Sequence, residues 1–336
     1  MTATPIKQRV YSAIKYIILL AVAALLLWAS FRGVHWDDFV TGLKSANYWW
    51  IMLSMAIGVL AFFLRALRWR LIMLPLGKKI RRKDAWHGIN IGYITNFAIP
   101  RAGEFARCGV ISKKTGLPFE TVAGTVVLER SIDLLALIIT TFAVLIFHKN
   151  KFAAFINREI IDSIGDRFSN GIFWIAGALA LSFIVFLFLV YRLREHYPFF
   201  RKIANVVKGV LSGVVSGFRM NQKWLFLFYT VAINVCYWLM SYTTILAFSA
   251  VGNLGASDAL FLMVIGGFGW VVPVQGGIGA YHFIISLALT TIYGIDQTTG
   301  VVFATISHES QALTMIIFGI ISLLSLYLPK PKFVSQ

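Results

Sequence analysis

Six apolar runs, each close to the length that crosses a bilayer, constrain this chain more than any other feature. They cover residues 16–31, 49–64, 134–147, 172–191, 225–251 and 301–328. A helix needs about 20 apolar residues to span the hydrocarbon core of a membrane. Hydrophobic residues make up 58% of the chain and charged residues 13%, whereas a soluble domain has roughly a quarter of its residues charged. The sequence therefore predicts an all-α, polytopic membrane protein.

Basic residues ahead of the first apolar run give it some likeness to a signal peptide. They are Lys7, Arg9 and Lys15. A signal peptide would end in a small-x-small cleavage site, but the end of the run, residues 28–32, contains the bulky Trp28, Phe31 and Arg32. We therefore expect the first run to remain as an uncleaved membrane helix, followed by a short external loop at 32–44.

The chain has a net charge of +17, which taken alone would suggest a nucleic-acid partner. The basic residues, however, crowd the segments after the second and fourth runs, and residues 252–300 contain no Lys or Arg. Cytoplasmic loops of membrane proteins carry this excess, so the charge indicates orientation. We expect no nucleic acid, both termini in the cytoplasm, a bacterial inner membrane as the location, and anionic lipids at the basic clusters. The first cluster comprises Arg65, Arg68, Arg70, Lys78, Lys79, Arg81, Arg82 and Lys83.

Two short apolar pieces, 84–99 and 105–112, follow the first basic cluster and are separated by a hinge at 100–104. Basic residues flank the pair on both sides, and each piece is too short to span. The pattern predicts a re-entrant hairpin that enters from the cytoplasm, because broken backbone at membrane depth is tolerated only inside protein or beside a polar cavity.

The second half of the chain repeats this order with the opposite orientation. Two further short pieces, 257–272 and 280–293, are separated by a hinge at 273–277, and both hinges contain Pro-x-x-Gly. The sequence therefore predicts an inverted-topology repeat with about six spanning helices and two re-entrant helical hairpins, a pattern typical of transporters. The predicted organisation is a first repeat at 1–150 with its hairpin near 84–112, then an external loop, span four and a cytoplasmic amphipathic linker at 151–223, then the rest of the second repeat at 224–330 with its hairpin near 257–293.

Several charged or titratable residues fall inside predicted spans. The third span is expected at about 121–147, and Glu129, Arg130 and Asp133 lie about 12–18 Å along it at 1.5 Å per residue. His308 and Glu309 lie at a comparable depth in the sixth span. Charges at this depth are costly, so they face a cavity or a partner. They are either buried ion pairs that fix the helices or an intramembrane network that takes part in substrate or proton coupling, and we favour the network.

The hinges carry residues suited to anions. Guanidinium groups form planar forks that match phosphate, and a helix N-terminus presents free backbone N–H groups. We expect a substrate site made of Arg101, Gly103, Glu104, Arg107, Gln275, Gly276, Gly277 and His282. For the glycines, tight turn geometry is an equally good explanation.

No catalytic or metal-binding pattern is complete in the sequence. His308-Glu309 begins a His-Glu-x-x-His zinc motif, but position 312 is Ala. The two cysteines, Cys108 and Cys236, have neither disulfide nor metal-ligand spacing. We therefore expect no catalytic residue, no metal and no cofactor, although a pair of carboxylates could still perform acid–base chemistry on a lipid phosphate.

Three groups of residues, taken together, give the chain a likeness to the transmembrane domain family of the lysylphosphatidylglycerol synthases. They are Asn96, Pro100, Arg101, Gly103, Glu104 and Arg107, then Glu129, Arg130 and Asp133, then Pro273, Gly276, Gly277 and Gly279. The resemblance covers roughly residues 10–330 and implies a flippase-like protein whose polar centre contains Arg101, Glu104, Glu129, Arg130 and Asp133. Fused members of that family carry a soluble transferase domain, and none follows Leu328 here, so synthase activity is not expected.

The favoured function is transport of an anionic phospholipid or a polyprenyl-phosphate-linked lipid across the bilayer, without enzymatic chemistry. Two alternatives stay open at this point: a proton-coupled carrier of a small polar solute, and an intramembrane lipid-modifying enzyme. The expected partners are the lipid, the membrane and a further copy of the chain in a homo-oligomer.

Overall fold

The computed structural model of the protein describes residues 6–147 except 79, scattered positions between 185 and 201, and residues 221–327. All regular structure in these residues is helical. The chain divides into two compact units, one made of Met1–Val126 with Leu225–Gln336 and the other of Val127–Trp224. The predicted span four, with the loop before it and the linker after it, lies outside the described residues apart from the scattered positions.

Five long helices coincide with predicted spans one, two, three, five and six. They are α1 (Ile6–Phe31), α3 (Tyr48–Met73), α6 (Phe119–Phe147), α10 (Lys223–Leu246) and α13 (Gln297–Tyr327). Within the described residues, four segments are long and apolar enough to cross a membrane: Tyr48–Leu76, Lys223–Leu246, Gln275–Tyr293 and Gln297–Leu326. A fifth is counted if Tyr16–Phe31 and Trp36–Ser45, bent by 85°, form one span. The chain is a helical membrane protein, as the sequence predicts.

The segment predicted as a short external loop after the first span contains a helix instead. Helix α2 (Trp36–Ser45) has Asp37 and Asp38 in its first turn, where carboxylates interact favourably with the positive end of the helix dipole. Its Phe39 is buried, and the Phe39 ring lies 5.3 Å from that of Phe31 in α1. The two aspartates in this segment are therefore the start of a helix that packs against α1.

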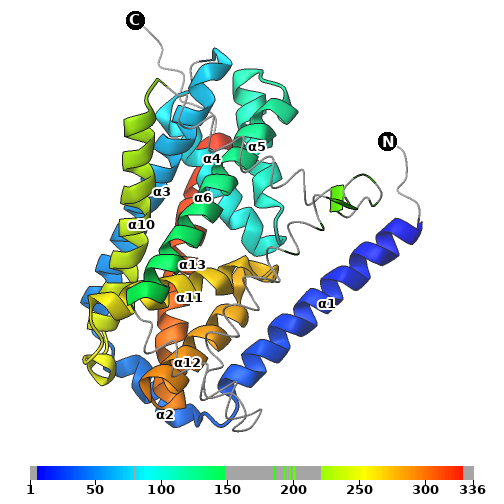
Figure 1. Ribbon diagram of the computed structural model, residues 1–336. Helices are drawn as coiled ribbons and strands as arrows, with labels where there is room; N and C mark the ends of the chain where they lie inside the picture. Colours follow the sequence, from blue (N-terminus) through cyan, green and yellow to red (C-terminus); the bar gives the residue numbers. More distant parts are fainter. Residues whose placement is uncertain are drawn as a thin grey trace, which may run out of the picture. The chain divides into compact units, whose positions relative to one another are not determined.

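Two helical hairpins occupy the positions that the sequence predicts for the two pairs of short pieces. The first joins α4 (Arg82–Ala98) to α5 (Gly103–Thr115), and the second joins α11 (Ala256–Val271) to α12 (Ala280–Tyr293) through the short η5 (Gln275–Gly277). The N-terminal half of α13 packs against α12 and its C-terminal half against α4, so one long helix supports both hairpins (Figure 1). The depth of the hairpins in a membrane, and the inverted relation of the two halves, stay predictions.

The first hairpin closes through a direct backbone contact. A Cβ placed on Gly103 would lie 1.9 Å from the carbonyl oxygen of Gly92, so only glycine allows α5 to approach α4 this closely. Behind the hairpin, buried residues from α3, α4, α5 and the start of α6 form one apolar core. Its members are Ala66, Trp69, Met73, Ile80, Ala85, Ile89, Cys108, Ile111, Leu117, Val122 and Val126.

The second hairpin is tied instead to the first helix of the chain. A Cβ on Gly279 would lie 2.3 Å from the carbonyl oxygen of Ala23 in α1. Val274 and Ala280 bury their side chains in the same small cluster as Ala23. Helix α1 therefore packs against the tip and the second helix of this hairpin.

Each hairpin is also fastened at its open end by an aspartate in the first turn of its first helix. Asp84 accepts a hydrogen bond from Lys114 in the last turn of α5, at 2.9 Å. Asp258 accepts one from the hydroxyl of Tyr293, the last residue of α12, at 3.0 Å. The two hairpins thus use the same fastening at equivalent places.

Candidate functional site

The tips of the two hairpins meet. A Cβ on Gly276 in η5 would lie 2.5 Å from Cε1 of Phe97, near the end of α4, and η5 packs against α4. The C-terminal end of α4 and η5, which are far apart in the sequence, therefore lie side by side within the first compact unit. This contact brings the two groups of predicted substrate residues into one region.

The tip of the first hairpin is strained and basic. Arg101 has φ 63°, the sole positive φ at a non-glycine residue in the part of the chain that the structure describes. A left-handed backbone conformation costs an arginine roughly 1 kcal/mol, and strain of this kind gathers at functional sites. The Arg101 side chain is exposed. Next to it, the backbone N–H of Gly103 donates to Asn96 Oδ1 at 2.7 Å and holds the turn closed.

Arg107, the second arginine predicted in the substrate site, lies inside the protein. It is buried, and its guanidinium carbon lies 4.8 Å from the centre of the Trp69 ring, within the range of a cation–π contact. The Trp69 ring is itself fixed, because its Nε1–H donates to Thr125 Oγ1 at 2.9 Å. Arg107 therefore supports the first hairpin from within, whereas Arg101 presents its charge at the tip.

Two further buried arginines were missed at the sequence level, where they counted as cytoplasmic charges after the second span. Arg65 and Arg68 lie within α3 and are buried. Arg65 donates through Nη1 to the Tyr237 hydroxyl of α10 at 3.2 Å. Their spacing of three residues, which puts them on one helix face, was the available signal.

Two acceptor atoms at the tips have no hydrogen-bond partner in the described structure. They are Oε2 of Glu104, in the first turn of α5, and Oε1 of Gln275, in η5. An unsatisfied buried acceptor costs about 1–3 kcal/mol. Both residues were predicted in the substrate site, and both atoms could accept hydrogen bonds from a ligand that carries donors.

The tip of the second hairpin is nearly bare backbone. Gly276, Gly277 and Gly279 have φ values of 56°, 78° and 80°, which side-chain-bearing residues rarely adopt. The carbonyl oxygen of Gly276 lies 2.8 Å from Nε2 of His308 in α13, and the His308 ring stacks on Trp270 at 4.9 Å between centroids. Here the glycines serve turn geometry, and a neighbouring helix fixes the turn.

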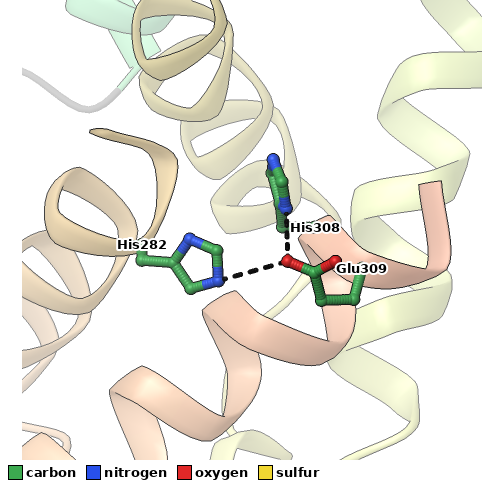
Figure 2. Close-up of side chains that lie close together, drawn as sticks. All are labelled: His282, His308 and Glu309. Carbon is green, nitrogen blue, oxygen red and sulfur yellow. Dashed lines mark hydrogen bonds and ion pairs between the residues drawn. The ribbon is translucent and has the colours of Figure 1, made fainter. Parts of the chain in front are cut away.

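Beside this tip, three titratable side chains converge. His282 comes from α12, and His308 and Glu309 come from α13 (Figure 2). Both imidazoles face Oε1 of Glu309, with distances of 3.7 Å from His282 Nε2 and 2.9 Å from His308 Nδ1. The histidines are buried, whereas the Glu309 side chain is 53% exposed. Sequence reasoning placed His282 with the substrate residues and the other two in a coupling network, and the structure joins all three.

The charged residues of α6 form a local group of their own. Arg130 lies 3.8 Å from Asp133 and 3.9 Å from Glu129, measured between side-chain nitrogen and oxygen atoms. Glu129 is buried. Arg130 is thus paired with Asp133 one helical turn away, within the second compact unit.

Comparison with known proteins bears on the chain as a whole. No curated protein matches it by sequence. The family described as the lysylphosphatidylglycerol synthase TM region matches residues 16–319, which include both hairpins, their meeting tips and the charged part of α6. This match spans most of the chain and ties it to membrane lipids, as the resemblance in the sequence implied. The chain belongs to the family of the lysylphosphatidylglycerol synthase TM region.

Proposed function

We propose that the protein transports an anionic lipid across the bilayer, with the headgroup passing along the two hairpin tips while the acyl chains stay in the membrane. The lipid is an anionic phospholipid or a polyprenyl-phosphate-linked lipid. The observation that carries this proposal is the meeting of the two tips, one of which bears the exposed Arg101. The family's link to membrane lipids supports the choice of substrate.

The physical difficulty that such a protein has to solve is the charge of the headgroup. An ionised group that loses its water without a partner costs many kcal/mol, so a phosphate does not cross hydrocarbon at a useful rate by itself. The guanidinium group of Arg101 offers the bidentate hydrogen bonds that a phosphate accepts. Its strained backbone holds that group at the end of the turn rather than along a helix face.

The acceptors at the tips complement this charge. Oε2 of Glu104 and Oε1 of Gln275 lack donors in the described structure. A headgroup that carries hydroxyl or amine donors beside its phosphate would satisfy an arginine and these acceptors together. This pairing favours a polar, donor-bearing headgroup over a bare phosphate.

Transport is testable with the purified protein in liposomes that contain a fluorescent anionic phospholipid in both leaflets. A membrane-impermeant quencher reports how fast label leaves the inner leaflet. Wild-type protein should accelerate this exchange for the anionic lipid. Arg101→Ala should abolish the acceleration, and Arg101→Lys should restore it only in part, because a point charge replaces a planar fork. Arg32→Ala removes another exposed arginine, just after α1 and outside both hairpins, and should have no effect.

Three results would overturn the proposal. Wild-type protein that never accelerates lipid exchange but binds a water-soluble solute would favour a carrier. A change in headgroup composition during the incubation, followed by mass spectrometry, would favour an enzyme. Equal loss of exchange in the Arg101 and Arg32 variants would show that general surface charge, and not the tip, controls the rate.

A further inference from the structure

The cluster beside the second tip has the composition and spacing of a metal site. One ligand atom from each of His282, His308 and Glu309 can be chosen so that all three lie within 4.8 Å of one another. A tetrahedral zinc site with bonds of about 2.0–2.1 Å separates its ligand atoms by roughly 3.3 Å. The two distances to Glu309 Oε1, 2.9 Å and 3.7 Å, lie on either side of that value.

The hydrogen bonds of His308 leave a place for a cation. Its Nε2 faces the carbonyl oxygen of Gly276 and its Nδ1 faces the carboxylate of Glu309. A neutral imidazole has a single N–H, so it can donate to only one of these two acceptors. When Nε2–H donates to the carbonyl, the lone pair of Nδ1 points at the carboxylate, and the two negative regions repel each other. A cation bound to both Nδ1 and Oε1 of Glu309 removes this repulsion. A backbone carbonyl that orients a histidine through its second nitrogen is the usual support of a metal ligand.

The position of Glu309 adds an argument from charge. It lies 12 residues beyond Gln297, the first residue of α13, hence about 18 Å along the helix axis. A carboxylate at such a depth in a span needs a compensating charge, which a metal cation held by the three side chains would supply. Nδ1 of His282 has no hydrogen-bond partner in the described part of the chain. The other ring nitrogen, Nε2, faces Glu309 and is the atom that would coordinate the ion.

We infer that His282, His308 and Glu309 bind one divalent transition-metal ion of the zinc class. Imidazole nitrogen with carboxylate oxygen suits such ions. Three protein ligands leave at least one coordination position for a water molecule or an anionic oxygen. The half-exposed side of Glu309 is where that position would open.

Metal binding is measured on the full-length protein in nanodiscs after chelator treatment, with Co²⁺ as a spectroscopic probe for zinc sites. We expect one Co²⁺ per chain, with visible d–d absorption that Zn²⁺ abolishes by displacement. Glu309→Gln and His282→Gln should each weaken Co²⁺ binding at least tenfold. Matched controls change exposed residues of the same types, Glu120→Gln and His35→Gln, and should bind as the wild type does.

A variant that fails to fold would also lose the metal, so the thermal midpoint of each variant is recorded alongside. His282→Gln breaks no hydrogen bond at Nδ1 and should therefore fold. Wild-type protein without stoichiometric Co²⁺, or folded ligand variants that bind like the wild type, would contradict the inference and leave a hydrogen-bonded cluster that holds a proton. The assay measures metal binding and does not follow the movement of lipid. Its outcome is therefore independent of the transport proposal.

Discussion

The two hairpins are held together and supported in the same way, but they differ at their tips. Both begin with an aspartate that is bonded to the last turn of the second helix, and both are supported by α13. The first tip offers a strained, exposed arginine. The second offers glycine backbone beside two histidines and a glutamate. The same architecture therefore carries a fixed positive charge at one tip and glycine backbone beside three possible cation ligands at the other.

The close contacts of the hairpins differ in the same way. Gly103 lets the first hairpin close on itself, whereas Gly279 lets the second dock on α1. The second hairpin also closes on itself, at Gly269 against the backbone of Tyr281, but it is in addition tied to a helix from the start of the chain.

The largest expected effects come from filling these two contacts. Gly103→Ala places a methyl group against the Gly92 backbone and should lower the free energy of unfolding by at least about 3 kcal/mol. Gly279→Ala should lower the free energy of unfolding by a similar amount, and it should also detach α1 from the second hairpin. Faster limited proteolysis of the N-terminal segment would detect this detachment. Gly109→Ala, with open space around its Cβ, should leave stability equal or raise it by up to about 1 kcal/mol. If Gly103→Ala also detached α1, the two glycine contacts would not act on separate parts of the molecule, contrary to the expectation.

The aromatic supports of the hairpins should differ by a smaller amount. Trp69→Phe removes the hydrogen bond to Thr125 and part of the surface under Arg107, with an expected cost of about 2–3 kcal/mol. Tyr281→Phe removes only a hydroxyl that pairs with Ser307 at 2.8 Å, with an expected cost of about 1 kcal/mol. Thermal unfolding in detergent measures both. Equal costs would mean that the cation–π contact contributes nothing.

The stabilising contributions of Asp84 and Asp258, at the open ends of the two hairpins, should respond differently to salt and pH. Burial raises the pKa of Asp84, but hydrogen bonds from Arg81 and Lys114 outweigh it and hold that pKa below its ordinary value. Its contribution to stability is therefore complete at neutral pH, and it is lost as the pH falls through the lowered pKa.

Asp84→Asn should cost about 1 kcal/mol at pH 7, and high salt should shrink that cost because the partners are charged. Two groups that donate hydrogen bonds to Asp258, the backbone N–H of Gly255 and the hydroxyl of Tyr293, are neutral. Asp258→Asn should therefore cost a similar amount with little dependence on salt. The comparison is made by unfolding in low and high salt, and identical salt responses would contradict it.

The helices of this fold are predictable from the sequence because glycine and proline interrupt apolar runs. The second helix of the second hairpin was predicted at 280–293, where α12 lies, and the first helix of the first hairpin at 84–99, where α4 begins two residues earlier. Helix α2 was missed because ten residues that include two aspartates look like a loop in a hydropathy profile.

The site was less predictable, since its contacts join distant segments. Counting charges assigned Arg65 and Arg68 to a cytoplasmic cluster, and only tertiary packing shows that they are buried. The zinc motif was dismissed because Ala312 replaces its second histidine. In the structure a histidine from another helix, His282, lies near the pair instead. A test for ligands along one helix cannot find a ligand from its neighbour.

The central claim is that the first tip keeps a strained arginine for the sake of its charge. Arg101→Gly separates the two roles, because glycine adopts φ 63° without strain but carries no guanidinium group. Its folded state should be as stable as the wild type or more stable by up to about 1 kcal/mol.

The decisive measurement is lipid exchange by Arg101→Gly in liposomes, with unfolding recorded on the same preparation. The account predicts unchanged or raised stability together with loss of anionic lipid exchange. Exchange at the wild-type rate in a stable Arg101→Gly variant would contradict it, because the charge at the tip would then have no part in transport.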